Sequence, residues 1–375
     1  MRELTAALTL FSSLKFFEDA VVATIISTEG STYRKAGTRG LFLNDGRSAG
    51  ILSGGCLENE IKQIALKVSK KNAAEIHSFD SRSSDDILLG FGLGCNGKVD
   101  VLFEPLSIQN SLNAFKLRLD QYCSIKKETH TYNISVFLET HTNTFQLLNT
   151  YTCHSETYDF HILNQEFNVF LDHQLIALIE SKKTTWSTFS DSQNKKYAVF
   201  AEIPQRQKEL TIFGAGTDAF SLAENASLQG WKIHIWDHRS SALELFSTFK
   251  NAHTHLMPRA LQGHEFISIE SDAMIVMTHN FLMDLEIIKA LSGKKIHYLG
   301  LLGPKVRGDS LIQQAQMCGC DTSQFQIFSP VGLDIGGNGP DEIAVSIVSG
   351  IISQSRGKID SQSSQQKNSY SAWGV

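Results

Sequence analysis

The stretch that most restricts the fold is ELTIFGAGTDAFSLAENASLQGWKIHIWD, residues 209–237. It predicts a strand at Leu210–Phe213, a glycine turn, a helix that ends near Gln229, and a second strand that ends at Asp237. The turn satisfies the G-x-G-x-x-G/A pattern, and an acidic residue follows about 20 positions later. This order of elements predicts a Rossmann-like parallel sheet.

Each residue of this motif has a physical task in a dinucleotide-binding site. Gly214 allows the tight turn, Gly216 lacks the side chain that would block a pyrophosphate, and Ala219 lets the helix approach the strand. The helix N-terminus offers N–H donors to an anion. Asp237 is placed to accept both ribose hydroxyls and would repel a 2′-phosphate, which favours NAD over NADP. The alternative is a Rossmann-like fold that binds no nicotinamide cofactor.

A second apolar strand, AMIVMTHN, ends in Thr278 and His279. Both are expected at the carboxyl edge of the sheet, where doubly wound folds bind their ligands. The alternative interpretation is that His279 caps a helix spanning about Asp284 to Leu291.

Two further glycine-rich segments follow in the same half. Gly303 begins a turn that carries Lys305 and Arg307, which suits either a bound phosphate or a plain turn with solvated charges. The loop at 332–337 contains more glycine than a connection needs, which suggests close approach of a ligand.

The segment SGGCLE, residues 53–58, places a cysteine before a run that is predicted to be helical from about Leu57. At a helix N-terminus, unsatisfied N–H groups and the helix dipole favour the thiolate form of Cys56. The adjacent Gly54 and Gly55 would let the backbone approach a bulky ligand.

A second glycine cluster, GFGLGCNGK, contains Gly94 and Cys95. One interpretation is that Cys56 and Cys95 face a common site. The other is that both are small buried residues beside glycine turns, because free cysteine is among the most buried residue types.

Length and composition limit the class of protein. A chain of 375 residues, with 42% hydrophobic and 19% charged residues, suggests two or three globular folding units. The net charge of −5 and the absence of Lys/Arg blocks argue against nucleic acid as a partner. The N-terminal run MRELTAALTLFSSLKFF predicts an amphipathic helix and not an export signal or membrane anchor. We therefore expect a cytoplasmic protein in which the six cysteines are reduced thiols.

These patterns predict an α/β protein with four segments. Residues 1–105 form an N-terminal mixed α/β domain, and 106–207 form a strand-rich middle segment in which NISVFLET, TFQLLNT, EFNVFLDH and KYAVFAEI are mainly antiparallel strands. Residues 208–353 form the C-terminal Rossmann-like parallel-sheet domain. The Ser/Gln-rich residues 354–375 are expected to form a flexible tail.

Seven motifs together resemble those of one family, the XdhC/CoxI group of xanthine dehydrogenase accessory proteins. In the N-terminal part they are GSTYRKAGTR, GILSGGCLENEI and GFGLGCNGKVDVLFEPL. In the C-terminal part they are IFGAGTDA, MTHNFLMDLEIIKAL, YLGLLGPKVR and PVGLDIGGNGPDEIAVSI. The resemblance covers about two thirds of the chain, without the strand-rich middle and the tail.

The resemblance implies a maturation chaperone more than a turnover enzyme. Such proteins bind the molybdenum cofactor, Mo-molybdopterin, protect it, and help to insert its sulfurated form into a molybdenum hydroxylase, together with a cysteine desulfurase. On this reading Cys56 and Cys95 are candidate ligands for molybdenum or acceptors of sulfur. Arg34 and Arg39 are candidates to neutralise the pterin phosphate, with solvated surface charge as the alternative.

A homodimer is also expected, since the ligand of a two-domain chain often lies in a cleft. The alternative function is an NAD-dependent oxidoreductase that uses the C-terminal domain. In that case His279 is the candidate acid or base.

Overall fold

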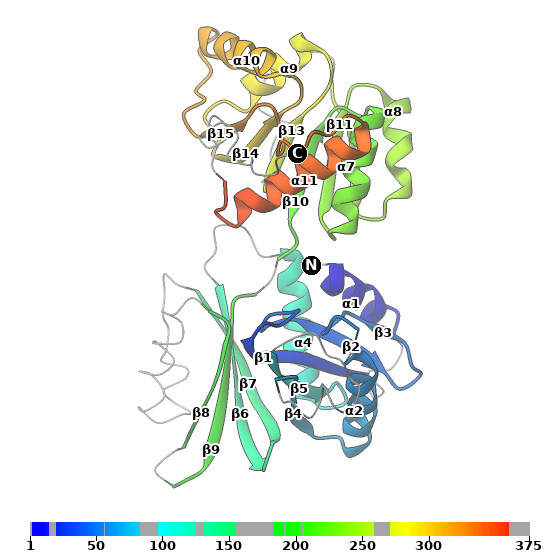
Figure 1. Ribbon diagram of the computed structural model, residues 1–375, viewed down its shortest axis with the longest axis vertical. Coiled ribbons are helices and arrows are strands. Elements are labelled where there is room, and N and C mark those ends of the chain that lie inside the picture. The colour runs from blue at the N-terminus through cyan, green and yellow to red at the C-terminus, as the bar shows by residue number, and fades with distance from the viewer. Residues whose placement is uncertain are drawn as a thin grey trace, which may run out of the picture. The chain divides into compact units, whose positions relative to one another are not determined.

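The computed structural model describes residues 2–14, 20–55, 57–82, 97–124, 131–154, 183–190, 193–204, 206–258 and 271–359. The chain divides into two compact units, residues 1–206 and 207–375, and each is considered by itself (Figure 1). None of the helices in the described ranges combines the length and the apolar character needed to cross a bilayer.

The first unit is built on one antiparallel sheet, to which the described residues contribute nine strands in the order β3-β2-β1-β5-β4-β7-β6-β9-β8. The strands are β1 (Ala20–Gly30), β2 (Arg39–Leu43), β3 (Ser48–Ala49), β4 (Ala74–Asp80), β5 (Gly97–Pro105), β6 (Thr131–His141), β7 (Thr144–His154), β8 (Thr185–Ser190) and β9 (Lys196–Glu202). Its helices are α1 (Arg2–Ser12), α2 (Glu58–Lys71) and α4 (Gln109–Ser124).

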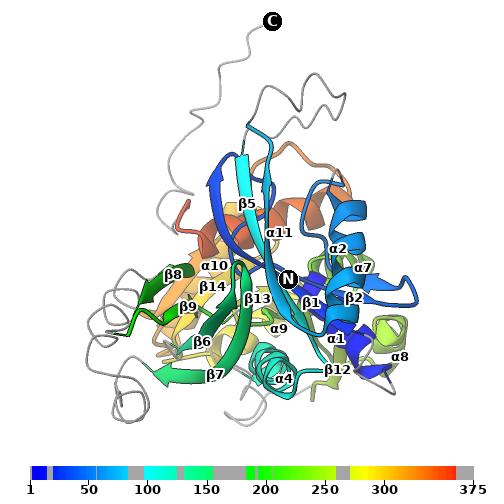
Figure 2. The ribbon, with the colours of Figure 1, turned by 90° about the horizontal axis from the view of Figure 1, so that it is seen from below.

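Strand β1 is apolar on both faces because helices cover both sides of the sheet. Val21, Ala23 and Ile25 join a core cluster with α2, whereas Ala20 and Val22 join a second cluster with α1 and α4. This double burial explains why the segment is a nearly continuous apolar run instead of an alternating one. Figures 1 and 2 show α2 against β1 and β5.

The strand-rich middle segment continues the sheet of the N-terminal segment, because β7 pairs with β4. Strands β6, β7 and β9 contain three of the four runs expected to be strands, and their pairing is antiparallel as predicted. The fourth run, EFNVFLDH at residues 166–173, lies outside the described residues.

The second unit contains a parallel sheet of six described strands in the order β12-β11-β10-β13-β14-β15, which confirms the Rossmann-like expectation. The strands are β10 (Glu209–Phe213), β11 (Lys232–Asp237), β12 (Ala252–Leu256), β13 (Ala273–Val276), β14 (Ile296–Leu301) and β15 (Phe325–Phe328). The helices are α7 (Thr217–Leu228), α8 (Ser240–Glu244), the 3₁₀ turn η1 (Leu245–Thr248), α9 (Phe281–Ala290), α10 (Lys305–Met317) and α11 (Pro340–Ser355).

Helices α9 and α10 cover one face of this sheet, and their apolar side chains share a core cluster with Phe213, Met274 and Leu299. Helices α7 and α11 pack against each other (Figure 1). The strand order reverses between β10 and β13, so their carboxyl ends form the topological switch point where doubly wound sheets bind ligands. Residues 360–375 of the expected flexible tail lie outside the described residues.

Candidate functional site

A cavity of about 650 Å³ lies in the first unit, between the N-terminal turn of α2 and the sheet. We call it the α2 cavity. Its apolar lining consists of Leu52, Leu57, Ile61, Phe79, Val99 and Val101, and its polar lining includes Ser31, Thr32, Ser53, Asn59, Ser78 and Ser81. An apolar lining with several polar groups is typical of a small-molecule site, as is this volume.

The turn before α2 is organised by the chain's own hydrogen bonds. The Oε1 atom of Glu58 accepts the N–H groups of Leu52, at 2.9 Å, and Ser53, at 2.8 Å. The hydroxyl oxygen of Ser53 in turn accepts the N–H groups of Gly55 and Leu57, both at 3.2 Å. Helix α2 begins at Glu58 with Leu57 as its N-cap, in agreement with the helix expected from about Leu57. The turn in front of it therefore has a defined shape.

The exposed Tyr33 and the half-buried Arg34 form one wall of the α2 cavity. Tyr33 is 62% exposed, and the guanidinium carbon of Arg34 lies 5.1 Å from the centroid of its ring. Gly54 lines the same cavity beside this ring, at ordinary contact distance for a side chain in its place. Sequence reasoning did not single out Tyr33, although an exposed aromatic residue next to an arginine in a predicted loop is a usable signal.

Strand β5 begins against Ser31 of the same loop, and only glycine fits there. A Cβ atom on Gly97 would lie 2.3 Å from the carbonyl oxygen of Ser31, which is closer than any real contact. This close approach joins the 31–34 loop to the start of β5, so both contribute to the α2 cavity.

Arg39 does not line the α2 cavity. Its guanidinium is 7% exposed and donates to Glu202 across 2.6 Å, and Arg118 of α4 donates to the other oxygen of Glu202, also across 2.6 Å. Burial raises the pKa of Glu202, but the two guanidinium groups outweigh this effect and lower it. Arg39 therefore belongs to an interior ion-pair network that links β2, β9 and α4.

Several predicted site residues, namely Cys56, Gly94 and Cys95, lie outside the described residues. Their neighbours in sequence, Leu57 and Gly97, line the α2 cavity. Within the described ranges, no three His, Cys, Asp or Glu side chains are grouped so that they could hold one metal ion.

The glycine motif of the second unit lies at the switch point. Gly214 has φ +114°, and a Cβ atom there would lie 2.5 Å from the carbonyl oxygen of Met277, just beyond β13. Gly216 is the N-cap of α7, and Ala219 is fully buried. The motif thus provides the close chain approach that its spacing predicts.

Asp237 is 2% exposed, and both of its carboxylate oxygens are used within the chain. They accept the N–H of Ala215 at 2.7 Å, the N–H of Arg239 at 2.8 Å, and the guanidinium of Arg239 at 2.8 and 3.0 Å. Burial alone would raise the pKa of Asp237, but these donors outweigh it and lower the pKa to about 2. Ribose hydroxyls would have to displace Arg239 to reach the carboxylate.

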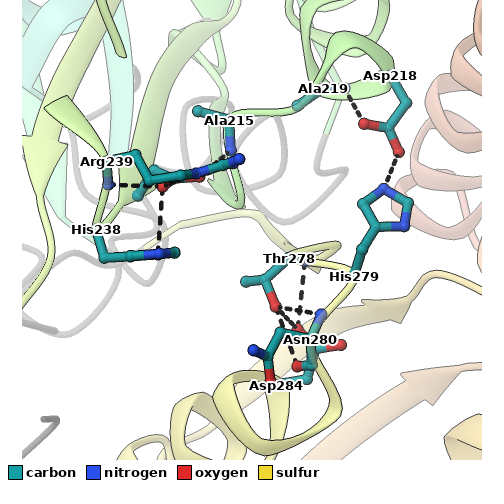
Figure 3. A network of polar contacts seen from close by, with 10 residues as sticks. Ala215, Asp218, Ala219, His238, Arg239, Thr278, His279, Asn280 and Asp284 are labelled. Carbon is teal, nitrogen blue, oxygen red and sulfur yellow. Dashed lines mark hydrogen bonds and ion pairs between the residues drawn. The ribbon is translucent and has the colours of Figure 1, made fainter. Parts of the chain in front are cut away.

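Across the switch point, His279 contacts Asp218 of α7, with 2.7 Å between Nε2 and Oδ2 (Figure 3). His279 has φ +59°, in the left-handed region that non-glycine residues rarely adopt. It does not cap α9: the cap is Asn280, whose side chain accepts the N–H groups of Leu282 and Met283, so the capping alternative is wrong.

Thr278 and the second glycine turn are tied to a buried acid that sequence reasoning missed. The carboxylate of Asp284 accepts the hydroxyl of Thr278 (Figure 3). Its other oxygen accepts the guanidinium of Arg307 at 2.6 Å. Gly303 has φ +113° in the turn before α10. Arg307 therefore neutralises an internal carboxylate in this structure.

Both units can be compared with known proteins. A Bacillus subtilis protein named as a probable subunit of xanthine dehydrogenase is 33% identical over 337 residues, which is 89% of this chain and 93% of that protein. The chain belongs to the XdhC and CoxI family. Residues 17–80 match this family, and residues 210–351 match the XdhC Rossmann domain.

The family fold is also seen in a solved structure. A crystal structure titled as a xanthine dehydrogenase from Bacillus halodurans is similar with a TM-score of 0.71 and 27% identity, covering 96% of this XdhC and CoxI family chain and 97% of that one. An uncharacterised Escherichia coli protein, YqeB, is 27% identical over 159 residues, which is 41% of this chain and 29% of that protein.

Proposed function

We propose that this XdhC and CoxI family protein is an accessory protein of a xanthine dehydrogenase-type molybdenum hydroxylase. In this proposal the first unit binds the molybdenum cofactor as cargo, protects it, and assists its sulfuration and insertion into the apo-enzyme. A cysteine desulfurase is the proposed source of the sulfur. The names of the relatives, which mention xanthine dehydrogenase, support the choice of client.

The observation that carries the proposal is the α2 cavity. Residues from the segments 30–39, 50–61 and 90–106, which are far apart in the sequence, line this one space. These are the three N-terminal motifs that resemble the family. A shared lining is expected if the three motifs serve one ligand.

The chemistry of the lining suits a phosphorylated pterin. The exposed ring of Tyr33 offers a flat surface for a heteroaromatic ring, and aromatic stacking of this kind contributes about 1–3 kcal/mol per base in nucleic-acid complexes. Arg34 supplies positive charge for a phosphate, and polar side chains of the lining such as Ser31 and Asn59 supply hydrogen bonds for ring nitrogens and oxygens.

The two cysteines remain candidates for binding molybdenum or sulfur. Cys56 is bonded to Leu57, which lines the α2 cavity, and Cys95 is two residues from Gly97, which also lines it. A thiolate is a soft ligand and a nucleophile, so either role fits its chemistry.

The test is binding of the isolated molybdenum cofactor to the full chain, followed by the absorbance and fluorescence of the pterin. Tyr33→Ala, Cys56→Ala and Cys95→Ala are each expected to weaken binding about tenfold or more, which corresponds to about 1.4 kcal/mol. Cys318→Ala is the matched control, because this exposed thiol lies at the end of α10 in the second unit.

The control should bind like the parent. Unchanged binding in all three cavity variants, with melting temperatures retained, would contradict the placement of the cargo in the α2 cavity. In a second test, the parent is loaded with sulfurated cofactor and mixed with a cofactor-free xanthine dehydrogenase. If the parent does not restore activity to this enzyme, the proposed client is contradicted.

A further inference from the structure

The second unit carries a dinucleotide-type motif, but a side chain of the protein lies where the dinucleotide would bind. In Rossmann folds the second glycine of the motif leaves room for the pyrophosphate. A Cβ atom on Gly216 would lie 2.6 Å from Oδ1 of Asp218. The carboxylate of Asp218 therefore occupies the space next to Gly216 that the missing side chain leaves open.

Asp218 is held in this place from both sides. Its Oδ1 atom accepts the N–H of Ala219 at 2.9 Å, in the first turn of α7, and its Oδ2 atom contacts Nε2 of His279 at 2.7 Å (Figure 3). An N–H group and a helix dipole that would attract a phosphate are thus already used by an anion of the chain itself. The side chain of Asp218 is only 15% exposed.

While His279 is bonded to Asp218, its Nε2 atom is not available to a phosphate. Its left-handed backbone, with φ +59°, is a conformation that persists only where the surrounding structure holds it. The pair joins α7 to the end of β13, the two elements on either side of the switch point.

The ribose contact is filled in the same way. The carboxylate of Asp237, which would accept ribose hydroxyls, is bonded to Ala215 and Arg239. Two contact points of a bound dinucleotide, the pyrophosphate and the adenosine ribose, are therefore occupied by groups of the chain.

We infer that Asp218 is a specificity-determining residue that excludes dinucleotides from the glycine turn of the second unit. A pyrophosphate at Gly216 would stand within a few ångströms of this carboxylate, and like charges at such distances repel strongly near a protein surface. The inference reverses the expectation of an NAD site that the motif alone suggests. It is independent of the proposed cargo site, which lies in the other unit.

The experiment is calorimetric titration of the full chain with NAD and NADP, using the parent, Asp218→Asn and Asp218→Ala. Asp218→Asn keeps the shape and removes the charge, and Asp218→Ala also clears the space at Gly216. Asp321→Asn is the matched control. Asp321 is an exposed aspartate that accepts the N–H of Ser323, and it precedes β15, so it lies at the amino ends of the parallel strands and not at their carboxyl ends.

We expect the parent and Asp321→Asn to show no binding of either dinucleotide up to about 1 mM. Asp218→Ala should bind with a dissociation constant about 10- to 100-fold below this concentration, and Asp218→Asn should show a smaller gain in affinity. Tight binding of either dinucleotide by the parent would overturn the inference. So would the absence of any gain in both variants when their melting temperatures match that of the parent.

Discussion

The two units treat buried charge in opposite ways. In the first unit one of the interior carboxylates, Glu202, is paired with Arg39 and Arg118 at a position that does not line the α2 cavity. In the second unit Asp218, Asp237 and Asp284 gather near the carboxyl edge of the parallel sheet, where a ligand would be expected. The paired charges of the first unit thus lie away from the α2 cavity, whereas side chains of the second unit occupy the position where Rossmann folds bind their ligands.

The difference shows that a sequence motif and an available site are separate properties. The glycines of the second unit still serve the close contact between β10 and β13, whether or not a ligand binds. A motif is therefore evidence for a fold first and for a ligand only when the surrounding charges allow it.

The largest expected effect comes from breaking the ion-pair network of the first unit. Glu202→Ala leaves two buried guanidinium groups without their carboxylate, which should lower the free energy of unfolding by about 3–5 kcal/mol. Hydrogen exchange in urea, read separately for β9 and β10, should show destabilisation of the first unit alone.

The matched control for this prediction is Glu139→Ala on β6. Glu139 lies 3.8 Å from the largely exposed Lys196, so its loss should cost about 0.5 kcal/mol or less. An equal effect of the two substitutions would show that burial does not distinguish the two pairs.

Gly214→Ala tests whether the motif glycine is needed for folding. A Cβ atom there combines a left-handed backbone with a 2.5 Å approach to a carbonyl oxygen, so the second unit should lose about 2–4 kcal/mol. Gly319→Ala has a left-handed backbone, φ +82°, in open space and should cost only about 1 kcal/mol. Thermal unfolding measures both, and equal losses would mean that the close approach is not important.

Asp237→Asn should change the acid stability of the second unit. The pKa of Asp237 in the folded chain, about 2, lies below the value of about 3.9 in an unfolded chain, so its stabilisation is present above about pH 4 and is lost as the pH falls through 2. With allowance for solvent around the half-exposed Arg239, the parent should exceed the variant by about 1–2 kcal/mol at pH 7.

Urea unfolding of parent and variant at pH 7 and at pH 2.5 tests whether the stabilisation by Asp237 decreases as the pH falls. The difference between the two proteins should shrink at the lower pH, because the carboxyl group of the unfolded parent is then protonated and that of the folded parent is partly protonated. A difference that is the same at both values would rule out the ionised carboxylate as its source.

The smallest effect on stability is expected in the turn beside the α2 cavity. Ser53→Ala removes the acceptor for two N–H groups of this part-buried turn and should cost about 1 kcal/mol. Hydrogen exchange of Gly55 and Leu57 should accelerate, whereas Ser107→Ala, which removes an exposed hydroxyl contact with Asn72, should leave it unchanged. Equal exchange in both variants would show that Ser53 does not organise the turn.

Much of the fold could be predicted because its signals are short-range. The strand from Leu210, the glycine turn and the strand that ends at Asp237 follow from apolar periodicity and turn chemistry within one 29-residue window, 209–237. The helix expected from about Leu57 is also found, as α2, with Leu57 as its N-cap.

The candidate site could be predicted only in part. The sequence pointed to the neighbourhood of Gly54, and this glycine does line the α2 cavity. It also suggested Arg39 as a cation for the pterin phosphate, but Arg39 is an interior group whose partner, Glu202, is 163 residues away. A contact between residues so far apart produces no periodic pattern in the sequence, so it could not be predicted from the sequence.

Local patterning of apolar residues, glycines and acids was enough to identify the α/β class, the parallel sheet and the family motifs. The direction of each charged side chain depended on packing between distant segments. The sequence around a carboxylate such as Asp218 does not show whether the side chain faces solvent or a ligand position. The electrostatic energy of the carboxylate depends on the donors and charges that the fold brings near it.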